Sequence, residues 1–137
     1  MKILRLLPLF LVFALRLPAQ SAESDLNFAF SQLKSNGPVP FARALYAGDT
    51  DSAKQLSERL GSLTGNSGDC FGYEVVSRKF ITKRIERFVV AIYFEKFPVY
   101  LRIDYYDTTK GRICLPASLS KEASDLLPFE IIAAAGK

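Results

Sequence analysis

The chain has 137 residues, with 18 Lys and Arg against 14 Asp and Glu, which gives a formal net charge of +4. It contains two cysteines and no histidine. This excludes Ser-His-Asp and Cys-His catalysis, imidazole-based metal sites and a usual structural zinc site within one chain. No spaced carboxylate cluster resembles a calcium loop, so we expect neither a metal nor another cofactor.

The N-terminus has the three parts of a secretory signal peptide. Lys2 and Arg5 give a positive start, residues 6–15 form an apolar stretch, and a run of small residues follows. Cleavage after Ser21 fits small residues at the −3 and −1 positions, with residues 19 and 22 as alternatives. The apolar stretch ends at Arg16, well short of the roughly 20 residues of a membrane span. We therefore expect residues 1–22 to be removed.

The expected mature chain, residues 23–137, forms a single domain that works in the periplasm or outside the cell, with no membrane span. Removal of Lys2, Arg5 and Arg16 leaves 15 basic against 14 acidic residues, a net charge of +1. The basic character of the precursor is therefore no argument for nucleic acid as a partner. About 115 residues are enough for one hydrophobic core.

The first half of the mature chain shows helical spacing of apolar residues. A first helix is expected to begin at a cap formed by Ser24 or Asp25 and to end at residues 36–38. A second helical stretch begins near Pro40, and a third helix covers residues 49–61. Two or three short helices are the result.

Beyond a glycine-rich connection, the pattern changes to period two. Four strands are expected over residues 73–80, 85–95, 99–106 and 112–117. The short connections between them make neighbouring strands antiparallel. Helices followed by such a meander predict an α+β fold, with the helices packed on one face of a four-stranded antiparallel sheet. A last helical turn is expected within 121–127, before an apolar segment that docks in an extended form.

The two central strands suggest that both faces of the sheet are covered. In the third strand, Val99, Leu101, Ile103 and Tyr105 point one way and should meet the helices. The second strand is apolar on both faces, which is typical of a strand covered on both sides. A second copy of the protein, or curling of the sheet, would cover the outer face. We place a candidate ligand or interface surface there, at Phe88, Ile92, Tyr100 and Tyr106.

The order of segments resembles a known superfamily. The chain carries Gly-Tyr-Glu-Val-Val-Ser-Arg-Lys at 72–79, Ala-Ile-Tyr-Phe-Glu-Lys at 91–96 and Pro-Val-Tyr-Leu-Arg-Ile-Asp-Tyr-Tyr at 98–106. Over residues 24–118 this order resembles small secreted bacterial proteins of the nuclear transport factor two-like (cystatin-like) superfamily. The resemblance implies a curved sheet wrapped around helices, a pocket in the resulting cone and dimers through the sheet. Relatives often carry tryptophan where this chain has Arg112.

The two cysteines, Cys70 and Cys114, allow two interpretations. In an exported protein they can form a disulfide. It would close a loop of about 45 residues and stabilise the fold by on the order of 4 kcal/mol. The alternative is two separate buried thiols that pack as small apolar groups.

A catalytic hypothesis follows from the resemblance, because the superfamily includes isomerases that use an aspartate and a tyrosine in the cone. Asp104 would be the general base, with Tyr100 or Tyr106 as hydrogen-bond donors. Strand alternation opposes this role, since Asp104 is out of phase with the apolar face of its own strand. The alternative is an exposed Asp104 paired with Arg102 or Arg87.

Basic residues gather around the first hairpin, with Glu86 as the one acidic residue among them. They are Arg78, Lys79, Lys83, Arg84 and Arg87. This basic patch either docks an acidic partner of the cell envelope or keeps an edge strand soluble and unpaired.

Taken together, these patterns predict an exported, non-enzymatic domain that binds a ligand, such as a small apolar molecule, or a partner. Two alternatives stay open: a small pocket enzyme that moves a proton with a carboxylate base, and a homodimeric accessory protein of the envelope, paired through the sheet.

Overall fold

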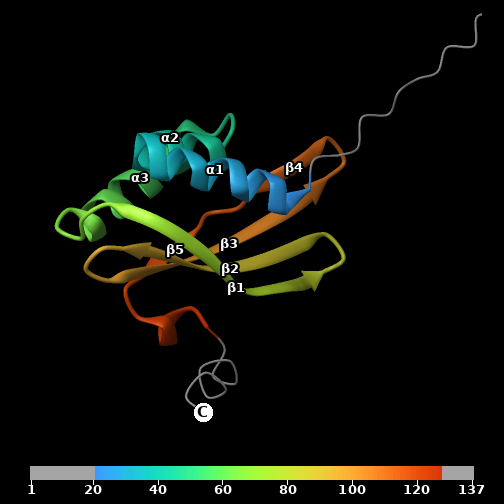
Figure 1. Ribbon diagram of the computed structural model, residues 1–137. Coiled ribbons are helices and arrows are strands. Elements are labelled where there is room, and N and C mark those ends of the chain that lie inside the picture. The colour runs from blue at the N-terminus through green and yellow to red at the C-terminus, as the bar shows by residue number, and fades with distance from the viewer. Residues whose placement is uncertain (1–20, 128–137) are drawn as a thin grey trace, which may run out of the picture.

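The computed structural model describes residues 21–127 and has one layer of helices over one face of a sheet (Figure 1). The helices are α1 (Ala22–Asn36), α2 (Pro38–Leu45) and α3 (Thr50–Thr64). The expected α+β fold is confirmed. Most of the expected signal peptide and the apolar C-terminal segment lie outside the described residues. None of the described helices is long and apolar enough to cross a membrane.

The helix boundaries follow from capping. The Ser21 hydroxyl accepts the N–H of Ser24 at 3.1 Å, so α1 begins before the expected caps Ser24 and Asp25, which lie in its first turn. Gly37 ends α1 with φ +89°, a conformation that residues with a β-carbon rarely adopt. Asp49 caps α3 by accepting the N–H of Ser52 at 3.0 Å.

The start of α1 bears on the expected cleavage positions. Ser21 caps the helix, and Ala22, with 2% of its surface exposed, belongs to the core. Cleavage after residue 19 would leave both in place. Cleavage after Ser21 would remove the cap and put a charged terminus on a buried residue, which is unfavourable.

Among residues 21–127, five strands form one antiparallel sheet: β1 (Cys70–Thr82), β2 (Ile85–Phe94), β3 (Pro98–Thr108), β4 (Gly111–Cys114) and β5 (Ser118–Ser120). The order is β1-β2-β3-β4, and β5 also pairs with β3. The expected fourth strand, 112–117, is thus interrupted. Pairing stops at Leu115, whose N–H still donates to Asp104 while its carbonyl accepts the Tyr46 hydroxyl, and it resumes at Ser118. The short 3₁₀ helix Ala123–Asp125 occupies the expected helical turn.

The core lies between the helices and one face of β2 and β3. As expected, Val99, Leu101, Ile103 and Tyr105 face the helices. The expectation that Phe88 and Ile92 share the outer face with Tyr100 and Tyr106 is wrong. Phe88 pairs with Ile103 and Ile92 with Val99, and residues paired across strands point to the same face, so both are core residues.

The outer side of β2 carries Val89 and Ala91, which are buried but lie outside the main core cluster. On β3, Val89 pairs with Arg102 and Ala91 with Tyr100. Long side chains of the neighbouring strand therefore flank these small ones on the sheet surface. The prediction that β2 is buried on both faces is confirmed.

The glycine-rich connection between α3 and β1 packs against the turn between β2 and β3. The Lys96 N–H donates to the carbonyl of Ser67 at 3.0 Å. Gly68 has φ +79°, and a β-carbon there would lie 2.5 Å from Oε2 of Glu95. The segment therefore needs glycine for a close approach, as a connection between elements does.

Candidate ligand-binding site

A cavity of about 440 Å³ lies between the helix layer and the part of the sheet formed by β3 and β4. Helix α1 contributes Asp25, the end of α2 contributes Ala44 and Leu45, and the connection from α2 to α3 contributes residues 46–49. The sheet contributes Tyr105 from β3 and Arg112 and Cys114 from β4. Three elements distant in sequence therefore meet at this cavity.

Tyr105 is the central polar residue of the cavity wall. It is 4% exposed, and its buried hydroxyl has no hydrogen-bond partner among residues 21–127. Burial raises its pKa, so the phenol is neutral and can donate a hydrogen bond. The charged and polar groups that act on this hydroxyl, from Asp25, Arg112, Tyr46 and Cys114, all line the cavity. A ligand atom that reached this orphaned hydroxyl would give it its missing partner.

Tyr46 is the second tyrosine of the cavity wall, and its hydroxyl has hydrogen-bond partners within the protein. Its hydroxyl donates to the carbonyl of Leu115 at 3.0 Å and accepts the N–H of Ala117 at 2.7 Å. Burial raises its pKa as well. Tyr46 therefore fixes the wall of the cavity and joins the helix layer to the segment between β4 and β5.

Charged groups stand at the more exposed part of the wall. The Arg112 guanidinium donates through Nε to Asp107 at 2.9 Å, and its Nη1 lies 3.9 Å from the Asp25 carboxylate. Partial burial raises the pKa of Asp25, and the charge of Arg112 opposes that rise. Burial raises the pKa of the Cys114 thiol to about 12, so it is no thiolate nucleophile near neutral pH.

The residues of the catalytic hypothesis lie away from the cavity. Asp104 is on the outer face, where its two carboxylate oxygens accept hydrogen bonds from Nε and Nη2 of Arg87, each at 2.7 Å. This is the ion pair considered as the alternative to a general base. Tyr100 and Tyr106 share the outer face with Asp104, and none of the three lines the cavity.

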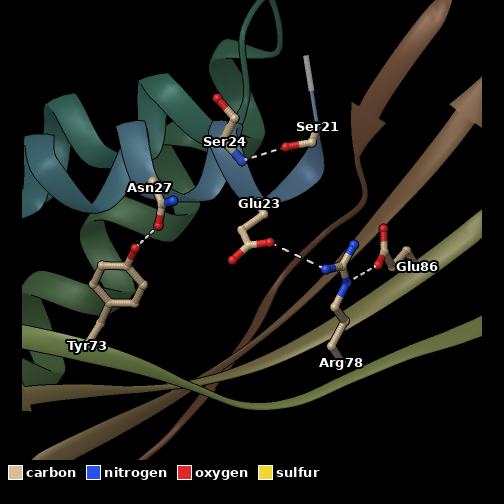
Figure 2. Close-up of polar contacts among 7 residues, drawn as sticks. All are labelled: Ser21, Glu23, Ser24, Asn27, Tyr73, Arg78 and Glu86. Carbon is tan, nitrogen blue, oxygen red and sulfur yellow. Dashed lines mark hydrogen bonds and ion pairs between the residues drawn. The ribbon is translucent and has the colours of Figure 1, made fainter. Parts of the chain in front are cut away.

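Two of the five residues of the basic patch form ion pairs within the described part of the chain, and three do not. Arg78 pairs with Glu86 and with Glu23 of α1 (Figure 2), and Arg87 pairs with Asp104. In the described part of the chain, the side chains of Lys79, Lys83 and Arg84 make no ion pair. These three remain available for an external partner.

The two cysteines are not joined. Cys70 is on β1 and Cys114 on β4, with β2 and β3 between them, which corresponds to about 14 Å of sheet. A disulfide needs Cα atoms within about 7 Å. The thiols instead contact nearby carbonyls, Cys70 that of Gly72 and Cys114 that of Leu115. The two-thiol interpretation therefore describes this structure.

The key residue of the cavity, Tyr105, was assigned to the correct face but not recognised as a site residue. A signal was present, because a tyrosine in phase with aliphatic core residues brings a hydroxyl that needs a partner. Asp25, Tyr46 and Arg112 come from separate elements and carry no shared pattern. Within residues 21–127, no group of three or more potential metal ligands comes together.

Comparisons of this chain with protein-family models, with curated proteins and with solved structures find no match.

Proposed function

We propose that this protein is an exported, non-enzymatic domain that holds a small, largely apolar molecule in the cavity between its helices and its sheet. The observation that carries the proposal is the buried, unpartnered hydroxyl of Tyr105 at that cavity. The ligand would place one hydrogen-bonding atom against this hydroxyl and apolar surface against Ala44 and Leu45. The proposal that the protein is exported rests on the signal-peptide pattern of residues 1–22.

The resemblance to the nuclear transport factor two-like superfamily supports the same proposal. It implies helices over a curved sheet with a pocket in the cone, and a cavity between helices and sheet agrees with that expectation. Asp104, the aspartate that the resemblance suggested as a base, is bound to Arg87 on the opposite face, which favours binding over catalysis.

The test is native mass spectrometry of protein recovered from the exported fraction of its host. The wild-type protein should retain a small molecule, and Tyr105→Phe should retain at least about tenfold less, because a buried hydrogen bond is lost. Tyr106→Phe is the matched control, since Tyr106 lies on the outer face, and it should retain as much as the wild type. An empty wild-type protein, or equal retention in all three, contradicts the proposal.

One observation favours a second function, proton transfer. Asp25 lines the cavity with a raised pKa, as a general base near a substrate would. The retained molecule would then exchange a carbon-bound hydrogen in D₂O on the wild-type protein and not on Asp25→Asn. A molecule that binds without such exchange leaves the non-enzymatic proposal in place.

A further inference from the structure

Strand β1 forms one edge of the sheet (Figure 1). It is 13 residues long and pairs with β2 alone among the described strands. A row of its backbone N–H and C=O groups therefore has no strand partner in residues 21–127. This free edge extends over about 40 Å.

The apolar residues of β1 are arranged along this edge in an unusual way. Three register irregularities leave Phe71, Val76 and Ile81 without a partner on β2, at intervals of five residues. These side chains are 61%, 36% and 42% exposed. With Val75 and Phe80, they make up five of the eight exposed large apolar residues in the described part of the chain. Bulges usually protect an edge strand from pairing with another chain, but here an exposed apolar side chain lies at each bulge.

Helix α1 holds β1 in place (Figure 2). The Tyr73 ring stacks on Phe30 with 4.0 Å between ring centroids, and its hydroxyl donates to the side chain of Asn27. Farther along the strand, Arg78 pairs with Glu23 of α1. An edge fixed at two points loses little conformational freedom when another strand docks on it.

The charges around β1 indicate the chemistry of the partner. Lys79 lies on β1, and Lys83 and Arg84 lie in the turn that follows it. None of these three side chains has an ion pair among the described residues. Glu74, the acidic residue of β1, accepts the hydroxyl of Tyr93. The edge therefore favours a partner that carries carboxylates.

We propose that the free edge of β1 takes up an extended segment of another protein, with alternating apolar and acidic side chains, as a further strand of the sheet. Backbone hydrogen bonds would give affinity, and contacts with Phe71, Val76 and Ile81 and with the three unpaired cations would give specificity. This site is separate from the cavity, so either proposal can fail without the other.

The test uses labelled peptides as probes. The peptide (Val-Glu)₄ should bind at least tenfold more tightly than (Val-Gln)₄, and (Val-Lys)₄ should not bind. Binding should weaken as salt is added. Amide hydrogen exchange of the complex should show new protection within β1. Equal binding of the acidic and basic peptides, or protection only outside β1, overturns the proposal.

Two variants with the same change in charge sharpen the test. Lys83→Glu, next to β1, should weaken binding of (Val-Glu)₄ about fivefold. Lys54→Glu, on α3 in the helix layer, should leave it unchanged. A wild-type protein that is already a dimer with β1 protected would overturn the proposal in favour of a second copy as the occupant.

Discussion

Asp49 sets the start of helix α3 and makes the stability of the fold depend on pH. Its carboxylate accepts the N–H of Ser52 at the start of α3, and hydrogen bonds from the Ser52 side chain and N–H lower its pKa. A group whose pKa is lowered by folding stabilises the protein above its unfolded pKa. That contribution is lost as the pH falls through the still lower folded pKa.

We therefore expect Asp49→Ala to lower the melting temperature at pH 7, because the cap is lost. Asp49→Asn keeps the capping oxygen and should melt close to the wild type at pH 7. Between pH 5 and pH 3, Asp49→Asn should lose less stability than the wild type. Thermal denaturation of the three proteins at these pH values checks this, and parallel curves for wild type and Asp49→Asn would contradict it.

Single-residue inference from the sequence worked where a side chain's role depends on local spacing. Alternation assigned Tyr105 to the helix-facing side and raised the pairing of Asp104 with Arg87 as an alternative. It could not show that the Tyr105 hydroxyl has no partner, because that depends on where α1 and the connection after α2 lie. The sequence contains no local signal for such long-range placement.

At the scale of elements, β3 was predicted well because it has no irregularity, so period two holds along its length. In β1 the bulge at Val76 reverses which residues face the helices. Val75 pairs with Val90, which belongs to the core, and Ser77 pairs with Val89, which lies outside the core cluster. A bulge has no fixed residue signature, so simple alternation fails beyond it. The break after Leu115 was not predicted, because it depends on Tyr46, which lies about 70 positions away in the sequence.

The pair of Arg87 and Asp104 joins β2 to β3 across the outer face. The two side chains are 34% and 19% exposed, and the contact is bidentate. A double-mutant cycle with Arg87→Ala and Asp104→Ala should give a coupling energy of about 1 kcal/mol. Arg87→Lys should keep less than half of it, because an ammonium cannot make both bonds in this geometry.

Urea denaturation measures this coupling. It should fall when the salt concentration is raised to about 1 M, where screening acts over a few ångströms. A coupling of zero at low salt would show that the pair contributes nothing to the stability of the sheet.

At the scale of the whole molecule, the helix layer and the sheet are joined by the Tyr46 hydroxyl. It bonds to Leu115 and Ala117, about 70 positions away in the sequence. Tyr46→Phe leaves a backbone carbonyl and a backbone N–H without their partner, which should cost about 2 kcal/mol of unfolding free energy. Tyr105→Phe removes a hydroxyl that has no partner in the described structure, so the ligand-free protein should be equally stable or slightly more stable.

These two variants make the same chemical change in two buried tyrosines of one cavity wall, so their difference isolates the bonding of the hydroxyl. Urea unfolding of ligand-free protein, followed by circular dichroism and tyrosine fluorescence, should give one shared transition for each variant, with Tyr46→Phe unfolding at lower urea. Equal midpoints would mean that the Tyr46 bonds do not hold the layers together. A large loss in Tyr105→Phe would mean that its hydroxyl supports the fold, and the binding proposal would then lose its main support.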